Sequence, residues 1–458
     1  MHLLIGILLL IEIIDIIFYY KDVKLPNKTY VIIFCALFFL GMCVLPFSMI
    51  KSASKSEFLN YLSYAAIFFF ITVILKKEDT GRIIKTMIIS TIMISLSFIL
   101  FSFKLIPFDI TINPNVLAGF MVIVFPFILD ILMKCKNKFS AGFAMLIIVI
   151  VLILAKSVIG WVCVGFELIL FLYFKFGAGR VSKYKWIVYG VLLTALTIII
   201  YKLFNADTYN RLRWWITGIA IIKDHPLFGV GPGCYSRAVI NYGGSGLGSQ
   251  YAHSYFLELI SEWGIIWALV YFYLIGRILK KIKIYKNHFP VFISAAIGIG
   301  INSIFEYNLL IPAVGMYFWI VLAVINADSE SVERFIRRES EQRFVIGALM
   351  TIFLLLFIGN SVKLFLSNRA SAAGLYLYQE NQINKALDKF NYALELEQSA
   401  SIARVQRGRI YYLKYIESVE KAWLYNSLID LEEGSMRQKG NRLLLSEISL
   451  LRTELNKR

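Results

Sequence analysis

The sequence predicts an all-α fold dominated by a polytopic bundle of membrane-spanning helices. Hydrophobic residues make up 59% of the 458 residues and charged residues only 17%, whereas soluble domains are about 45–50% apolar and about 25% charged. The apolar residues form continuous runs of about 20, the length that a helix needs to cross a bilayer core of about 30 Å. Because these runs do not alternate with polar residues, they favour helices over a barrel.

Charged breaks divide the apolar runs into about twelve predicted spans. The first lacks the basic start and the small-residue exit of a cleaved signal peptide, so we expect it to be a retained helix. The spans are predicted at 3–20, 29–50, 58–75, 83–103, 115–133, 139–155, 157–174, 186–204, 254–276, 289–305, 309–326 and 344–366.

Lysine and arginine concentrate in alternate loops between these spans. One set carries 22 basic residues and the other carries 8, which by the positive-inside rule makes the first set cytoplasmic. The N-terminus, the long loop at 205–253 and the C-terminal tail are then extracytoplasmic. The formal net charge of +17 therefore reports orientation in the bilayer, and we expect no nucleic acid partner. The basic set is 21–28, 76–82, 134–138, 175–185, 277–288 and 327–343, and the other set is 51–57, 104–114, 156, 205–253 and 306–308.

The chain divides into four predicted parts. A bundle of about eight spans covers 1–204, an extracytoplasmic loop with the functional motifs covers 205–253, further spans cover 254–366, and a helical tail covers 368–458. In the tail, Gly374 and the later Ala386, Phe390 and Ala393 fit the pattern of a tetratricopeptide repeat, and a shift of 34 residues places Gly374 on Gly408. The tail is thus predicted to be tetratricopeptide-like and to recruit protein partners. An amphipathic helical hairpin without repeat ancestry is the alternative.

The motifs that bear on function gather in the long loop and the helix after it. An Arg-Leu-Arg-Trp-Trp stretch covers 211–215, a His-Pro-Leu-Phe-Gly-Val-Gly-Pro-Gly stretch covers 225–233, His-Ser-Tyr-Phe-Leu covers 253–257 and Glu-Trp-Gly covers 262–264. In order and spacing this resembles the O-antigen ligase and polymerase family, bacterial membrane enzymes that handle polyprenyl-diphosphate-linked glycans. Asn115, in an Asn-Pro-Asn segment, resembles a segment that the family places on the outer face.

The resemblance implies a GT-C-like helical fold in the bacterial cytoplasmic membrane, an active site on the outer face, and no metal or other cofactor. Two departures stand out. Where the family has a His-Asn pair, this chain has His253 followed by Ser254, and where the family often has Ser-Arg, it has Lys156 followed by Ser157. Lys156 is predicted to replace that arginine as a point charge, without its bidentate fork.

Transfer of a glycan from a lipid diphosphate needs a cation for the leaving group and a base for the acceptor. Negative charge grows on the phosphate oxygens as the anomeric C–O bond breaks, and a guanidinium pairs two such oxygens while keeping its proton. Arg211 is therefore the predicted diphosphate ligand, with Arg213 and Lys156 as further substrate contacts. His253 is predicted to position or deprotonate the acceptor hydroxyl. As alternatives, the arginines are interfacial anchors and the histidine is a helix-start residue.

Asn115 and four further residues are predicted to support the site, and Glu306, in a short outer loop, is another candidate for it. Glu258 and Glu262 are four residues apart and share one helix face; Glu262 either orients Arg211 or His253, or packs as a paired helix residue. Gly231 and Gly233 are predicted to make a tight turn that lets the backbone approach the site. No βαβ unit surrounds them, so they are not a dinucleotide fingerprint.

The sequence thus predicts a metal-independent membrane glycosyltransferase of the ligase type. Its predicted partners are a polyprenyl-diphosphate-linked glycan, an acceptor that is a cell-wall polymer, lipid or protein, and the bilayer. A polymerase that joins lipid-linked repeat units is the first alternative. A transporter of lipid-linked glycans, which would favour paired interrupted helices, and a scaffold built around the tail are the others.

Overall fold

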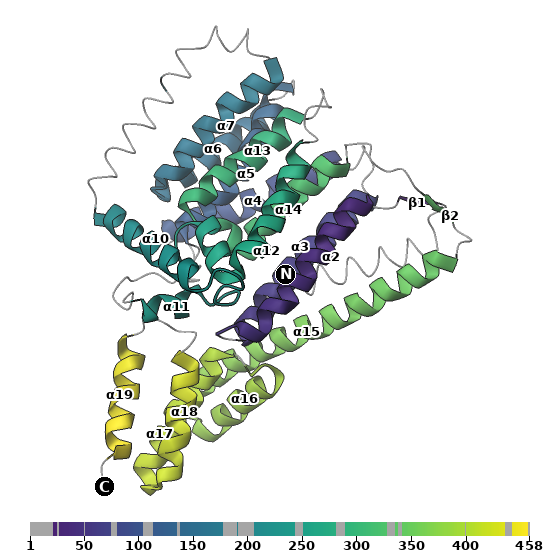
Figure 1. Ribbon diagram of the computed structural model, residues 1–458. Coiled ribbons are helices and arrows are strands. Elements are labelled where there is room, and N and C mark those ends of the chain that lie inside the picture. Colours follow the sequence, from purple (N-terminus) through teal and green to yellow (C-terminus); the bar gives the residue numbers. More distant parts are fainter. Residues whose placement is uncertain are drawn as a thin grey trace.

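The computed structural model is almost entirely helical over the residues it describes, with one short pair of strands (Figure 1). Those residues are 22–24, 27–49, 51–74, 80–103, 113–134, 138–176, 190, 206–242, 251–280, 289–327, 335–337, 341–398, 400–435 and 442–456. The first helices are α2 (Lys28–Val44), η1 (Leu45–Phe47), α3 (Lys51–Ile74), α4 (Thr80–Ser102), α5 (Pro114–Lys134), α6 (Phe139–Leu154) and α7 (Val158–Phe176). They are followed by α10 (Ala206–Asp224), α11 (Tyr235–Asn241), α12 (Tyr255–Lys280), α13 (Phe289–Phe305), η5 (Asn308–Leu310), α14 (Pro312–Ala327) and α15 (Glu341–Gln379). The tail holds α16 (Ile383–Leu396), α17 (Ser401–Ser418), α18 (Lys421–Ser435) and α19 (Arg442–Asn456).

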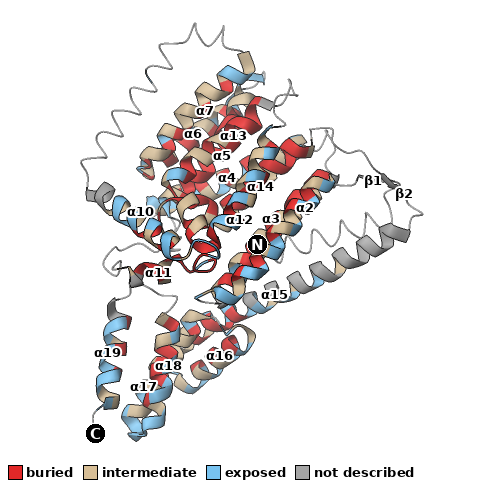
Figure 2. Ribbon diagram, viewed as in Figure 1, coloured by how far each residue is buried: buried red, intermediate tan, exposed pale blue. Residues whose placement is uncertain are grey.

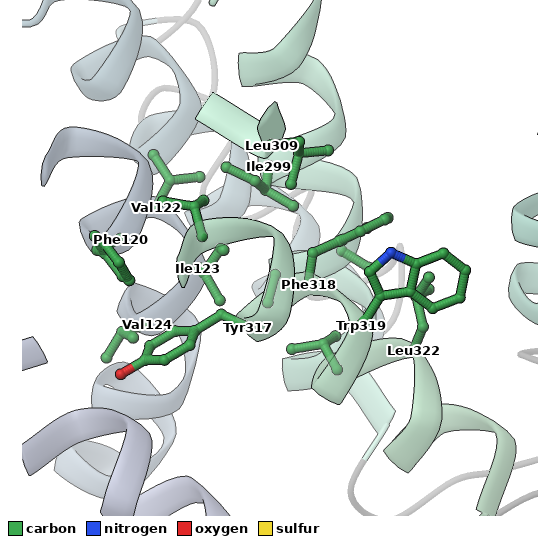
Figure 3. Close-up of a cluster of buried hydrophobic side chains, with 14 of the residues drawn as sticks. Phe120, Val122, Ile123, Val124, Ile299, Leu309, Tyr317, Phe318, Trp319 and Leu322 are labelled. Carbon is green, nitrogen blue, oxygen red and sulfur yellow. The ribbon is translucent and has the colours of Figure 1, made fainter. Parts of the chain in front are cut away.

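The central helix of the bundle is α5. All residues from 116 to 128 are buried, as expected for a helix that is apolar on every face, and Figure 2 shows burial concentrated on the helices around it. Phe120 meets Tyr317 of α14 edge-on with ring centroids 5.1 Å apart, and Phe127 meets Phe292 of α13 at 5.0 Å. Figure 3 shows Phe120 and Ile123 in this cluster beside Tyr317 and Phe318. Packing on all sides fixes α5 and the Asn-Pro-Asn segment at its start.

The predicted spans agree with the helices wherever the structure describes them. Each such span overlaps a helix, although α3 begins at Lys51, well before the span at 58–75, and α15 continues to Gln379, well beyond the span at 344–366. Spans 3–20 and 186–204 lie outside the described residues apart from Gly190. Among the described residues, 5 helices are long and apolar enough to cross a membrane. The chain is therefore an integral membrane protein of several spans, and the number twelve is not confirmed. The five are Lys28–Phe47, Thr80–Ser102, Pro114–Lys134, Val158–Phe176 and Tyr255–Lys280, and the shorter apolar helices are Phe139–Leu154, Pro290–Phe305 and Pro312–Ala327.

One end of the bundle collects the loops predicted to be poor in lysine and arginine. The Met49 N–H donates to the Val230 carbonyl at 3.0 Å, and the Asn113 amide donates to the Tyr307 hydroxyl at 2.7 Å. Near the other end, β1 (Asp22–Lys24) pairs antiparallel with β2 (Phe335–Arg337), and these strands lie in two of the basic segments. The side of the membrane that each end faces stays a prediction.

The tail begins within a continuous helix, because α15 runs through the predicted boundary at 366–368 without a break. Beyond it, helices pack in antiparallel pairs (Figure 1). A Cβ at Gly374 would lie 2.6 Å from the buried Phe390 ring, and one at Gly408 would lie 2.9 Å from Leu431. Both glycines thus permit close helix crossings, as the sequence pattern predicts. The identity of these hairpins as tetratricopeptide repeats stays a prediction.

Candidate functional site

The predicted long loop is largely helical, and α10 carries Arg211 toward the end of α13. Arg211 Nη1 donates to the Phe305 carbonyl at 2.6 Å, and Nη2 donates to Glu306 Oε1 at 2.7 Å. Phe305 is the last residue of α13, so its carbonyl has no partner within the helix. The guanidinium therefore caps α13 and pairs with the carboxylate that follows it.

Glu306 joins Arg211 to His253. Its side chain is only 2% exposed, and its second oxygen, Oε2, lies 3.3 Å from His253 Nδ1. The Glu306 backbone carbonyl also accepts from the Tyr255 N–H at 3.2 Å. This bond connects the cluster of Arg211, His253 and Glu306, called the corner below, to the start of α12. One buried carboxylate thus brings together the two residues predicted to carry the chemistry.

Aromatic rings hold the His253 imidazole on two sides. Trp214 of α10 stacks on it with centroids 4.5 Å apart and an interplanar angle of 18°, and Tyr307 meets it edge-on at 5.2 Å. Tyr251 stacks on Tyr307 at 4.0 Å. His253 itself has φ +50°, an uncommon backbone conformation for a residue with a side chain. The ring is therefore held in place with Nδ1 turned toward Glu306.

The electrostatics of this corner favour an ionised Glu306. Burial raises the pKa of the carboxyl, but the hydrogen bond with His253 and the charge and hydrogen bond of Arg211 outweigh burial, so its pKa lies below its ordinary value. Burial, with the Glu306 charge second, raises the pKa of Tyr307 to about 12. At neutral pH the corner therefore holds a carboxylate, a guanidinium and a neutral phenol.

The glycine-rich segment packs against a break in α12. Gly264 has φ +80° inside that helix, and a Cβ there would lie 2.0 Å from the Leu227 carbonyl oxygen. The break frees backbone groups of α12, so the Val230 N–H donates to the Ser261 carbonyl at 2.9 Å and the Ile265 N–H donates to the Pro226 carbonyl at 2.8 Å. The Gly231 N–H donates to the Glu262 carbonyl at 3.0 Å. The predicted tight turn is thus present, and its partner is the kinked helix.

Glu258 and Glu262 bind backbone N–H groups of the loops. Glu258 Oε2 accepts from Ala252 N at 2.8 Å, directly before His253. Glu262 Oε1 accepts from Tyr235 N at 2.8 Å, and its Oε2 accepts from Gly233 N at 2.9 Å. Both carboxylates are buried. Their support of the site is therefore indirect, through the loops that present His253 and the glycine turn.

The other predicted site residues lie on other elements or on another face of α10. Arg213 is exposed and lies about 200° around α10 from Arg211. Lys156 is exposed, with φ +49°, in the turn between α6 and α7. The Asn115 carbonyl accepts from Asn308 Nδ2 at 3.0 Å, whereas it is Asn113 that reaches Tyr307. Among the described residues, no group of three or more His, Cys, Asp or Glu could hold a metal ion.

The sequence indicates only weakly that Glu306 belongs to the site, although its side chain contacts both Arg211 and His253. It is a lone carboxylate between two apolar spans, in a connection where the sequence shows no other charge. That isolation is the one signal that could have raised its weight, because a charge beside apolar spans usually has a partner. Tyr307 and Trp214 could not be singled out from the sequence, because the chain has many aromatic residues.

Residues 143–272 match the family model of O-antigen ligase. This range contains Arg211, the glycine turn, His253 and the kink at Gly264, and it ends before Glu306. No curated protein and no solved structure matches the chain. The family resemblance predicted from the motifs is thus confirmed over this range, and it supports a membrane protein with glycan-processing enzyme activity at a coarse level.

Proposed function

We propose that this protein is a metal-independent membrane glycosyltransferase that moves a glycan from a polyprenyl-diphosphate carrier to an acceptor hydroxyl. The observation that carries the proposal is the pairing of Arg211 and His253 with one buried carboxylate, Glu306, at one end of an apolar bundle. The family match over 143–272 supports the same class of substrate.

Arg211 suits the leaving diphosphate. Its two contacts, with the Phe305 carbonyl and Glu306, take two of the five N–H donors of a guanidinium. The remaining donors can meet phosphate oxygens while Glu306 holds the group in position, and its 17% exposed side chain lies at the edge of the bundle. A fixed cation at this place stabilises the charge that grows as the diphosphate leaves.

His253 suits the role of base. Because Nδ1 faces the Glu306 carboxylate, we assign the ring proton to Nδ1, which leaves the lone pair on Nε2. The acceptor oxygen attacks the anomeric carbon and gives its proton to Nε2. The new C–O bond forms as the bond to the diphosphate oxygen breaks, and the electron pair of the broken bond leaves with the lipid diphosphate.

Glycan transfer by the purified full-length protein tests this function. Wild type, Arg211→Ala and His253→Ala receive a synthetic polyprenyl-diphosphate oligosaccharide with and without acceptors, and Lys223→Ala, at the exposed end of α10, is the matched control. We expect wild type and the control to transfer the glycan, and we expect transfer to be lost in both site variants. Equal activity of the site variants, or no lipid diphosphate released by folded wild type with any cognate donor, would contradict the proposal.

The form of the product separates two reactions of this class. A single adduct that needs an added acceptor indicates a ligase, which we propose. A product ladder made without an added acceptor indicates a polymerase, and Arg211 and His253 have the same roles in either reaction.

We also propose that the end of the bundle with Arg211 faces the outside of the cytoplasmic membrane, as the distribution of lysine and arginine predicts. Single cysteines at Arg213 and Lys134, both exposed positions, test this in a cysteine-free background. A membrane-impermeant thiol reagent added to intact cells should label Arg213→Cys and spare Lys134→Cys. The opposite labelling would place the site in the cytoplasm.

A further inference from the structure

A carboxylate without a partner lies at the middle of α7, inside the bundle. Glu167 has 0% exposure, and neither of its oxygens has a hydrogen-bond partner in the described part of the protein. It lies halfway along Val158–Phe176, one of the helices able to cross a membrane. A bare charge at that depth is strongly unfavourable. The group therefore needs a proton or a bound cation.

Helix α13 provides the space and the polar surroundings. A Cβ at Gly298 would lie 1.9 Å from Glu167 Oε1, so the missing side chain makes room for the carboxyl. Asn302 lies one turn further on the same face of α13, is fully buried, and its Nδ2 has no partner. Asn302 Oδ1 accepts from Asn308 Nδ2 at 2.8 Å, while Asn308 Oδ1 has no partner. An unpaired amide donor thus lies one turn from the gap at Gly298 that holds the Glu167 carboxyl.

A proton fits these groups better than a metal ion. Asn302 Nδ2 is a donor, which repels a cation, and the described residues contain no cluster of three or more metal-ligating side chains. A carboxylic acid keeps a C=O acceptor while losing the charge, and this acceptor matches the unpaired Asn302 donor, directly or through a buried water.

The titratable neighbour of Glu167 on its own helix is the buried Cys163, one turn earlier on α7, which also faces the Asn302 side chain. The charged groups on the neighbouring elements are already engaged. Lys175, about 12 Å further along α7, pairs at 2.9 Å with Asp130 of α5, which also pairs with Lys134. The sequence of α13 has no charged residue, and Glu306, which follows it, pairs with Arg211. In the parts of α5, α7 and α13 that the structure describes, no cation faces Glu167.

We propose that the interface between α7 and α13 is a proton-binding site in which Glu167 is a carboxylic acid, with Asn302 as its polar partner. The site is linked to the candidate active site through α13, because the Glu306 N–H donates to the Asn302 carbonyl at 2.9 Å. Loss of the proton would draw the Asn302 amide toward Glu167 and disturb the turn that presents Glu306. Glu167 is thus a positioning residue, and this last step rests on the proposed function.

Infrared spectroscopy of the reconstituted full-length protein tests the proton directly and independently of activity. We expect a carboxylic C=O band, sensitive to exchange into D₂O, in wild type that is lost in Glu167→Gln and kept in Glu395→Gln, an exposed control in the tail. Gly298→Ala, which places a methyl where Oε1 lies, should shift the band. A band unchanged by Glu167→Gln and by Gly298→Ala would overturn the proton site. So would a sodium-dependent rise of the unfolding temperature in wild type that Glu167→Gln abolishes, because it would indicate a bound cation.

The link to the active site has its own measurement. Glu167→Gln, which is neutral and nearly isosteric, should keep transfer near neutral pH and lose less activity at high pH than wild type. Superimposable pH profiles would overturn the link while leaving the infrared result in place. If wild type transfers no glycan but shows the band, the proposed function fails and the proton site stands.

Discussion

Arg211 Nη2 donates to Glu306 Oε1 at 2.7 Å, across 95 residues of sequence. This ion pair connects α10, which lies across the end of the bundle (Figure 1), to the end of a buried helix. Because the other oxygen of Glu306 faces His253, one carboxylate positions both Arg211, the proposed cation, and His253, the proposed base. The geometry of the candidate site therefore depends on a residue outside the motif region.

Replacing Glu306 should reduce transfer strongly. In Glu306→Gln the amide keeps the shape of the side chain but loses the charge that pairs with Arg211 and selects the His253 tautomer. Neutralising a buried carboxylate that orients a catalytic histidine can cost as much as about 10⁴-fold, so we expect a loss of at least about tenfold in the initial rate. Glu395→Gln, in the tail, is the control. Equal transfer rates for the two variants would show that Glu306 does not contribute to the reaction.

Removing the His253 side chain should allow chemical rescue. Glycine accepts the φ of +50° at this position, so His253→Gly keeps the backbone and leaves a gap between Trp214 and Tyr307. We expect a loss of about 10²–10⁴-fold, the usual contribution of a general base, and partial recovery with added imidazole. Arg211→Ala should show no such recovery. Rescue of both variants, or of neither, would argue against His253 as the base.

Much of this architecture could be predicted from the sequence, because long apolar runs follow directly from the thickness of a bilayer. Arg211 and His253 were identified because they lie in a motif with fixed spacing. The role of Glu306 could not be predicted, since its contacts arise where α13 ends beside α10, far away in the chain. For Glu258 and Glu262 the spacing gives a shared helix face, but backbone N–H groups of folded loops are their partners, and no sequence pattern records these.

The kink in α12 should be sensitive to a single methyl group. Gly264→Ala places a Cβ 2.0 Å from the Leu227 carbonyl oxygen at φ +80°, so we expect a loss of at least about 2 kcal/mol in stability together with loss of transfer. Gly276→Ala, in the same helix with nothing within 4 Å of its Cβ, should be close to neutral. Thermal unfolding of both variants checks this, and equal unfolding temperatures would contradict the role of the kink.

Acid should weaken the site through Glu306. Its pKa is lowered in the folded protein, so its contribution to stability is present above the ordinary carboxyl range and is lost as the pH falls through the folded value. Between about pH 7 and about pH 3, wild type should lose more thermal stability than Glu306→Gln, which does not titrate there. Parallel curves for the two proteins would show that the Glu306 ion pair adds no net stability.

Single-turnover release of lipid diphosphate tests most directly whether the Arg211 guanidinium acts on the leaving group. Wild type is compared with two variants. Arg211→Lys replaces the guanidinium at the site by an ammonium, and Lys223→Arg makes the reverse exchange at an exposed position of the same helix. Because lysine lacks the planar fork, we predict release at least about tenfold slower in Arg211→Lys and unchanged in Lys223→Arg. Equal release by wild type and Arg211→Lys would contradict the account.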